Sequence, residues 1–268
     1  NIEDVNVSVE TLRHLGAKVN WDPDAGVMEV DSSTIDRTDV PLELCRRMRA
    51  SSYYIGALLA RFGRAQVPLP GGCDIGRRPI DQHIKGMRAL GAKVETTRGM
   101  VLAEADELTG SDVFMDMVTV GGTINVMLAA CRAEGQTILS NVAKEPHVVD
   151  VANFLNMMGA SVRGAGTDVI RISGRPKLHG CGYAVIPDQI ETGTFMIAAA
   201  ATRGDVVIKN VIPTHMEAIS AKLMESGARV IEGDDGRDFY LRVVMDDRPR
   251  PVNIKTMVYP GFPTDMQP

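Results

Sequence analysis

One glycine-rich segment carries the residues best suited to do chemistry. Residues 70–79 read PGGCDIGRRP, so the thiol of Cys73 lies among three glycines and the guanidinium of Arg78 follows. Glycines allow close approach of the backbone to a ligand, successive N–H groups can form an anion-binding concavity, and an arginine fork suits carboxylate or phosphate. Cations and a helix N-terminus also favour the thiolate form of cysteine. The segment therefore predicts a thiol beside an anion site, and a flexible turn with an incidental cysteine stays open as the alternative.

Other polar residues have a structural explanation beside a functional one. Arg49 lies in a predicted helix, where a solvated or ion-paired arginine is the usual case. Asp265 can serve as the N-cap of a helix, and Asp188 with Glu191 can cap another. His83 lies one turn into the helix that starts at Pro79, where a surface position is expected.

Cofactor chemistry finds no motif to support it. The sequence has no G-x-G-x-x-G, no Walker loop and no His/Glu set with metal-ligand spacing, so we predict no cofactor and no metal. The cysteines are Cys45, Cys73, Cys131 and Cys181, and no two form a C-x-x-C pair. A zinc site or a dense disulfide framework is therefore not indicated, and a reducing cytoplasm fits best.

Composition excludes several classes of protein. Lys+Arg 29 against Asp+Glu 34 gives a net charge of -5 with no basic run, which argues against a nucleic-acid partner. The apolar stretches are shorter than the ~18 to 20 residues that cross a bilayer, so no membrane span is predicted. Hydrophobic residues at 44% and charged residues at 24% are typical of a globular protein.

A helix end that recurs four times organises the chain. The copies read LRHLGAKV, MRALGAKV, FLNMMGASV and KLMESGARV, with Gly16, Gly91, Gly159 and Gly227 at intervals of 75, 68 and 68 residues. Apolar residues precede the first three glycines at the steps of four and three that define one helix face, and in the fourth copy Met216 and Leu223 keep this pattern while Ser220 and Ser226 soften it. A glycine after such a face is a common C-cap, because positive φ costs a residue without Cβ little.

Strands and buried helices are predicted between these helix ends. Strands are expected over 26–30, 113–117, 168–172, 183–186, 205–210, 239–243 and 252–255. Helices that are apolar nearly all round are expected over 44–62, 123–133 and 194–202. The unit is then about two strands, a buried helix, a strand and an amphipathic helix, which predicts an α/β (α+β) fold. A period of this length exceeds the ~20 to 50 residues of solenoid repeats, so compact pseudo-symmetric domains are expected.

The segment around Cys73 is an insertion in this repeat. The interval from Gly63 to Gly91 is 28 residues, whereas the matching intervals that start at Gly135 and Gly204 are 24 and 23 residues. Extra loop length on a regular scaffold is where function tends to concentrate.

Taken together, these segments closely resemble the UDP-N-acetylglucosamine 1-carboxyvinyltransferases, enolpyruvyl transferases of the EPSP synthase-like family. The segments are RASSYYIGALLARFG from Arg49, LPGGCDIGRRPIDQHIKG from Leu69, VTVGGTINVMLAA from Val118, AKEPHVVDVANFL from Ala143, IPDQIETGTFMIAAA from Ile186 and FPTDMQ from Phe262. The resemblance covers all 268 residues. It implies an inside-out α/β barrel of six repeated units in two domains, about four of them present. Residues 1–186 would belong to the first domain, and residues 187–268 would begin the second.

The resemblance also implies a reaction. The family transfers the enolpyruvyl group of phosphoenolpyruvate to the 3-hydroxyl of UDP-N-acetylglucosamine, through a tetrahedral intermediate, in the first committed step of peptidoglycan synthesis. By resemblance, Cys73 is the general acid that protonates the methylene carbon and the residue that fosfomycin alkylates, which suits a thiol on a closing loop. Asp265 matches the acid proposed to take the proton of the sugar hydroxyl. We therefore expect a cytoplasmic transferase with small-molecule partners.

Binding residues follow from the same resemblance. Arg49 and Arg78 would hold phosphate and carboxylate charge. The family's nucleotide-sugar contacts match two segments, which are Arg78, Pro79, Ile80, Asp81 and Gln82, and then Met117, Val118, Thr119 and Val120. Met117 stands where some members have lysine, and Gln189 where many have arginine.

Parts of the family's pattern are absent from these residues. They are the N-terminal Lys-Asn pair, a later phosphate-binding arginine and roughly the last two repeats. The chain is expected to be a central fragment of a longer repeat protein, and these 268 residues alone are expected not to turn over. Two alternatives stay open: a 3-phosphoshikimate 1-carboxyvinyltransferase, whose members lack the PGGC loop, and a catalytically incomplete scaffold.

Overall fold

The computed structural model describes residues 2–70 and 79–264. The chain divides into two compact units. Unit 1 consists of Asn1–Ala143 and Val151–Cys181, and unit 2 consists of Lys144–Asp150 and Gly182–Pro268. The domain boundary expected between residues 186 and 187 stays a prediction.

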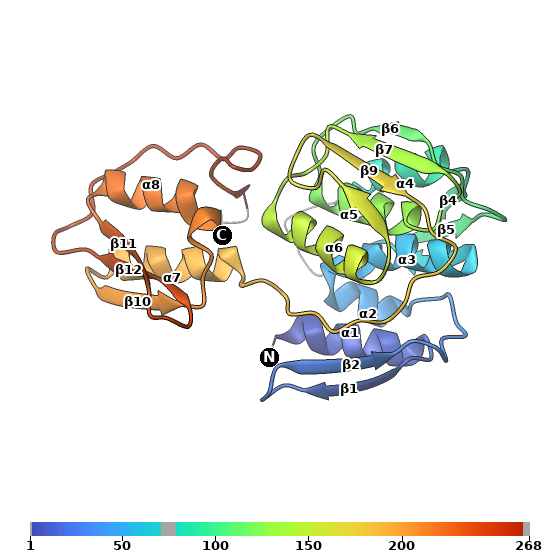
Figure 1. Cartoon of the computed structure of the whole chain (residues 1–268), viewed down its shortest axis with the longest axis horizontal. Helices are drawn as coiled ribbons and strands as arrows, with labels where there is room; N and C mark the ends of the chain where they lie inside the picture. The colour runs from blue at the N-terminus through green and yellow to red at the C-terminus, as the bar shows by residue number, and fades with distance from the viewer. Residues whose placement is uncertain (1, 71–78, 265–268) are drawn as a thin grey trace. The chain divides into compact units, whose positions relative to one another are not determined.

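Pairs of strands and helices follow one another through the chain in the general order that the repeat predicts, apart from two predicted strands that do not form (Figure 1). The helices of unit 1 are α1 (Glu3–His14), α2 (Leu42–Arg47), the 3₁₀ helix η1 (Arg49–Ser52), α3 (Tyr53–Phe62), α4 (Asp81–Ala89), α5 (Val120–Ala130) and most of α6 (Pro146–Met157). Its strands are β1 (Lys18–Asp22), β2 (Val27–Asp31), β3 (Arg64–Pro68), β4 (Lys93–Thr97), β5 (Met100–Glu104), β6 (Asp112–Phe114), β7 (Gln136–Ser140), β8 (Ser161–Arg163) and β9 (Val169–Ser173). Unit 2 contains α7 (Gln189–Ala201), β10 (Asp205–Lys209), η2 (Pro213–Met216), α8 (Glu217–Ser226), β11 (Arg229–Asp234) and β12 (Phe239–Val244).

The sheets repeat one topology. The strand orders are β3-β5-β4, β7-β9-β8 and β10-β12-β11. In each, the strand that comes last in the sequence lies between the two earlier strands and is antiparallel to both. In the first of these sheets Glu104 of β5 lies opposite both Arg64 and Lys93. The second sheet gains β6, which runs parallel to β7 with Val113 opposite Leu139. The mixed α/β class expected from the periodicity is confirmed.

The recurring glycines cap their helices as predicted. Gly16, Gly91, Gly159 and Gly227 have φ of 103°, 92°, 91° and 108°. These values lie in the left-handed region, where a side chain is strained and glycine is not. Each cap turns the chain into the first strand of a hairpin, so the helix ends fix where the sheets begin.

The helix predicted over 44–62 is wrong, because the structure breaks it into α2, η1 and α3. Met48 adopts an extended conformation with φ -136° and ψ 123°, and its side chain is buried. The apolar spacing continues across the break, since the residues on both sides face the same core, so periodicity alone does not reveal it.

Two predicted strands do not form. Residues 183–186 and 252–255 have no paired strand in the described part of the chain. A strand requires a neighbour for its backbone groups, and the sequence pattern does not supply one. Tyr183 instead donates its hydroxyl proton to Oδ1 of Asp150 at 2.5 Å.

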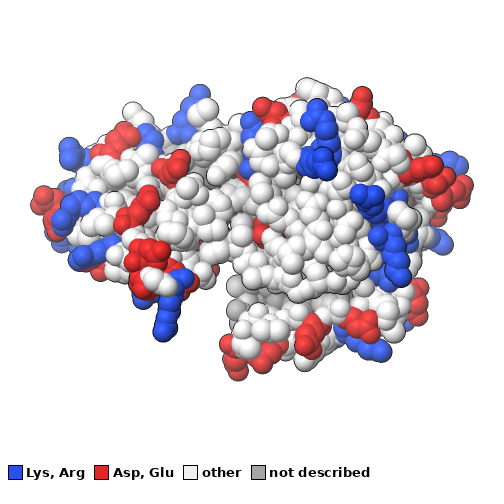
Figure 2. Space-filling view, in the orientation of Figure 1, with Lys and Arg blue, Asp and Glu red and all other residues white. Residues whose placement is uncertain are grey.

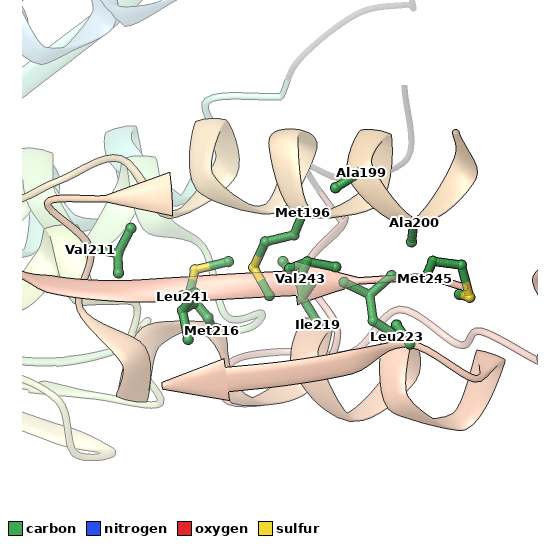
Figure 3. Packing of buried hydrophobic residues seen from close by; sticks show 11 residues of the cluster. Met196, Ala199, Ala200, Val211, Met216, Ile219, Leu223, Leu241, Val243 and Met245 are labelled. Carbon is green, nitrogen blue, oxygen red and sulfur yellow. The ribbon is translucent and has the colours of Figure 1, made fainter. Parts of the chain in front are cut away.

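The core of unit 2 forms between helices and sheet. Met196 of α7 points toward Leu241 and Val243 of β12, and Ile219 of α8 belongs to the same buried cluster (Figure 3). These side chains are almost fully buried, and each contributes about 1.5–3 kcal/mol through removal of apolar surface from water. The helix predicted over 194–202 is present but begins earlier, at Gln189, where the Asp188 side chain accepts the N–H groups of Ile190 and Glu191 and confirms Asp188 as the cap.

The described surface carries charge of both signs. On the face shown in Figure 2, acidic and basic side chains are intermixed, without a broad basic area. None of the helices in the described ranges has the length and apolar composition that crossing a bilayer requires. In the same ranges, no three His, Cys, Asp or Glu side chains gather as metal ligands would.

Candidate functional site

The two segments expected to contact a nucleotide sugar lie at the N-termini of neighbouring helices. Pro79 and Ile80 lead into α4, and Met117 to Thr119 lead into α5. The helices α4 and α5 pack directly against each other. Gly86 permits this, because a Cβ at that position would lie 2.2 Å from a γ-carbon of Val126. Tertiary packing thus brings the two segments together.

Gln82 joins the two segments. Its side-chain oxygen accepts the backbone N–H of Asp116 at 2.9 Å, and its Nε2 donates to carboxylate oxygens of Asp81 at 2.9 Å and Asp116 at 3.2 Å. Lys85 donates to the other oxygen of Asp116 at 2.5 Å. The hydrogen bonds from Lys85 and then Gln82 lower the pKa of Asp116, so this carboxylate is charged and paired at neutral pH. The buried Gln82 amide is fully engaged, and it contributes by fixing backbone positions.

The start of α5 is capped and anchored. Thr119 is extended, and its hydroxyl accepts the N–H of Gly122 at 3.4 Å. Thr123 donates its hydroxyl proton to the carbonyl of Thr119 at 2.7 Å and accepts the N–H of Ala143 at 3.1 Å. The first turn of a helix presents unpaired N–H groups and the positive end of its dipole. Two such turns side by side, α4 and α5, are suited to bind a phosphorylated ligand.

Arg49 lies at the break between α2 and α3, as the first residue of η1. Its side chain is exposed, and it has no ion-pair or hydrogen-bond partner among the described residues. Its neighbour Arg47, by contrast, is held by Glu3 and Glu10. Of the two ordinary states expected for this arginine, solvated or ion-paired, the structure shows the solvated one, so Arg49 has a guanidinium available for an anion.

A buried amide connects α5 with η1 and α3. Asn125 is fully buried, its Nδ2 donates to the carbonyl of Ser52 at 2.8 Å, and its Oδ1 accepts the N–H of Gly56 at 2.8 Å. The same Nδ2 lies 2.9 Å from Nδ1 of His83 on α4. Burial lowers the pKa of His83 from 6.5 to about 4, with the charge of Asp81 opposing the shift. The surface position expected for His83 is wrong, because this side of α4 packs against α5.

Three of the predicted site residues, Cys73, Arg78 and Asp265, lie outside the described residues. Two of the described cysteines, Cys45 and Cys131, are buried, and burial raises the pKa of both thiols, that of Cys131 to about 12. Neither is a nucleophile near neutral pH.

Sequence reasoning missed Lys85, Asp116 and Asn125. A polar Asn within the apolar run TINVMLAA was the available signal for Asn125, because a buried amide requires specific partners. No local signal pairs Gln82 with Asp116, which lie 34 residues apart.

The chain as a whole matches a known protein family. A protein-family model described as EPSP synthase (3-phosphoshikimate 1-carboxyvinyltransferase) matches residues 1–268. The chain belongs to the EPSP synthase family.

Curated relatives are similar over the whole chain. A protein of Clostridium botulinum named UDP-N-acetylglucosamine 1-carboxyvinyltransferase is 57% identical over 267 residues, which cover 100% of this chain and 63% of that protein. A protein of Caldanaerobacter subterraneus subsp. tengcongensis, named UDP-N-acetylglucosamine 1-carboxyvinyltransferase 3, is 54% identical with the same coverage. The chain therefore spans about 63% of the length of these relatives.

Solved structures share the fold. The enolpyruvyl transferase NikO from Streptomyces tendae superposes with a TM-score of 0.82 at 25% identity, over 99% of this chain and 63% of that one. EPSP synthase from Acinetobacter baumannii superposes with a TM-score of 0.66 at 21% identity, over 92% of this chain and 57% of that one. The expected EPSP synthase-like fold is confirmed.

Proposed function

We propose that the protein transfers the enolpyruvyl group of phosphoenolpyruvate to the 3-hydroxyl of UDP-N-acetylglucosamine and releases phosphate. The observation that carries this proposal is the pairing of the α4 and α5 N-termini through Gln82 and Asp116. It presents two sets of helix N–H groups on one side of unit 1, as a diphosphate requires. The names of relatives at 57% and 54% identity favour UDP-N-acetylglucosamine as the acceptor of a carboxyvinyl group.

Each candidate residue has a proposed part in the reaction. Cys73 donates a proton to the methylene carbon of phosphoenolpyruvate while the sugar oxygen bonds to its C2, and Asp265 takes the proton that the hydroxyl loses. Loss of phosphate and of a methyl proton then restores the double bond. The cationic groups of Arg49 and Arg78 hold the phosphate and carboxylate of phosphoenolpyruvate.

The nucleotide sugar is bound along two stretches of chain. They are Arg78, Pro79, Ile80, Asp81 and Gln82, and Met117, Val118, Thr119 and Val120. The stretches provide backbone N–H groups at the first turns of α4 and α5, while the side chain of Gln82 keeps them aligned. We further propose a cytoplasmic location, a place in peptidoglycan synthesis and no cofactor.

A direct test is to incubate the protein with phosphoenolpyruvate and UDP-N-acetylglucosamine and to follow both phosphate and the mass of the sugar product. We expect equimolar phosphate and enolpyruvyl sugar from the protein at the full length of its relatives, and none from these 268 residues alone. Absence of product from the full-length protein would refute the proposal.

Intact-mass measurement after treatment with fosfomycin and UDP-N-acetylglucosamine tests the thiol separately. One adduct is expected on the full-length protein and none on Cys73→Ala. Turnover of shikimate 3-phosphate in place of the nucleotide sugar would favour the sister activity after which the family model is named. Absence of binding to both acceptors would favour a scaffold.

A further inference from the structure

A buried polar pair connects four helical segments of unit 1, and the proposed reaction makes no use of it. His83 lies on α4 and Asn125 on α5, while the backbone groups that Asn125 binds belong to η1 and α3. Asn125 is 0% exposed and His83 is 6% exposed. Burial of polar side chains at this depth is costly without partners.

The hydrogen bonds fix both the amide and the ring. The N–H of Gly56 needs an acceptor, so Oδ1 of Asn125 faces Gly56 and Nδ2 faces away. One Nδ2 hydrogen goes to the carbonyl of Ser52, which leaves the other for Nδ1 of His83. Nδ1 must then be an acceptor, so the imidazole is neutral and carries its proton on Nε2.

The amide binds one helical turn at both ends. Ser52 and Gly56 are four residues apart, so their carbonyl and N–H are the pair that one turn brings together. Gly56 permits the approach, because a Cβ there would lie 2.3 Å from the backbone oxygen of Asn125. Ser52 ends the short helix η1 that Arg49 begins, and a 3₁₀ helix rises about 2 Å per residue, so Arg49 starts about 6 Å from the anchored carbonyl.

The ring of His83 also contacts the start of α5. A Cβ on Gly121 would lie 3.0 Å from Nε2 of His83. The imidazole therefore lies between Asn125 and the first turn of α5. One side chain therefore orients the amide and supports the α5 N-terminus.

We propose that Asn125, oriented by neutral His83, is a positioning residue that holds Arg49 in register with the Met117–Val120 segment. The inference rests on the proposed function, because it assigns Arg49 to phosphoenolpyruvate and the α5 N-terminus to the nucleotide sugar. The pair touches neither substrate. It sets the spacing between the two binding groups.

Asn125→Leu tests the proposal on the full-length protein. The KM for phosphoenolpyruvate should rise about tenfold or more, as loss of a hydrogen bond to a fixed backbone predicts. The Kd of UDP-N-acetylglucosamine alone should change less than about threefold, since Thr119 and Gln82 still hold the α5 entry. Equal effects on both constants, or none on either, would overturn the proposal.

Asn156→Leu is the matched control. Asn156 makes the same kind of contact elsewhere, because its amide bonds both the carbonyl and the N–H of Val162. This variant should lose stability without changing either substrate constant. If it raises the KM for phosphoenolpyruvate as much as Asn125→Leu does, the effect is general loosening and the proposal fails.

Two substitutions of His83 keep the test available if Asn125→Leu does not fold. His83→Asn places a carbonyl near the position of Nδ1, whereas His83→Leu offers no acceptor. His83→Leu should raise the KM for phosphoenolpyruvate, and His83→Asn should recover most of that loss. Equal behaviour of the two variants would refute orientation through Nδ1.

Hydrogen exchange separates failure of this inference from failure of the proposed function. If the wild-type protein releases no phosphate, the proposed function is rejected on that assay alone. The role of Asn125 in holding Ser52 and Gly56 is then tested through the backbone amide of Gly56, whose hydrogen exchange should accelerate about tenfold or more in Asn125→Leu. Unchanged hydrogen exchange at Gly56 would overturn the positioning role of Asn125, whether or not the protein is active.

Discussion

The side-chain oxygen of Gln82 accepts the backbone N–H of Asp116 at 2.9 Å, across 34 residues of sequence. This bond joins the first turn of α4 to the chain that enters α5. Because Asp116 is also paired with Lys85, an ion pair and hydrogen bonds together hold the two helix entries. We call these contacts among Gln82, Lys85 and Asp116 the bracket. The two stretches proposed to bind a nucleotide sugar cannot separate without breaking it.

Replacing Gln82 should weaken binding of the nucleotide sugar. Gln82→Ala leaves the N–H of Asp116 without its partner and frees the two helix entries to shift, so the Kd of UDP-N-acetylglucosamine should rise about tenfold. Calorimetric titration measures this. Gln136→Ala is the control, since Gln136 is exposed on β7, and it should leave the Kd unchanged. An unchanged Kd in Gln82→Ala would contradict the role of the bracket.

Removing the guanidinium of Arg49 should affect phosphoenolpyruvate selectively. Arg49→Ala deletes a cation that has no partner among the described residues, so the KM for phosphoenolpyruvate should rise about 10- to 100-fold. Affinity for UDP-N-acetylglucosamine alone should stay the same. Steady-state kinetics measures the KM for phosphoenolpyruvate of Arg49→Ala. The control is Arg46→Ala, because Arg46 is an exposed arginine on α2. Equal KM values for the two variants would remove Arg49 from the site.

Filling Gly86 should force α4 and α5 apart. The new methyl of Gly86→Ala would lie 2.2 Å from Val126, and such overpacking costs about 1–3 kcal/mol, offset by about 1 kcal/mol of better helix propensity. Urea denaturation should therefore show a net loss of stability. Adding Val126→Ala should make the pair markedly less destabilising than the sum of the two single changes. Additive effects would show that Val126 is not the clashing neighbour, and Gly180→Ala, with open space around it, serves as the control.

The neutral state of His83 predicts that acid destabilises the protein. Its folded pKa is about 4, below the ordinary 6.5, so between these values the unfolded chain binds a proton that the folded chain does not. The contribution of neutral His83 is fully present above pH 6.5 and is lost as pH falls toward 4, by about 3 kcal/mol.

Urea denaturation at pH 7 and pH 4.5 measures this loss. His83→Asn should reduce the difference between the two pH values, whereas His179→Asn, at an exposed position, should leave it as in the wild type. Identical pH dependence in the wild type and His83→Asn would show that another group titrates.

Local patterns in the sequence determine much of the fold. The four capping glycines, the helices before them and the hairpins after them follow from apolar spacing and from the freedom of glycine at positive φ, which act within a few residues. The same holds for the cap at Asp188, whose partners are two and three residues away. The sequence alone likewise shows that Cys73, Arg78 and Asp265 match motif positions of the family. Their roles in the reaction stay predictions.

Tertiary structure alone decided which distant residues meet. Local spacing does not reveal the break at Met48, the pairing of Gln82 with Asp116 or the hydrogen bonds of Asn125 to Ser52 and Gly56. The hydrogen bonds of Gln82 and Asn125 join residues 34 to 73 positions apart. Such contacts form only where small residues such as Gly56 and Gly86 let backbones approach, and where every buried polar group finds a partner. Spacing along one helix encodes which face is buried, but the geometry of packing selects what that face touches.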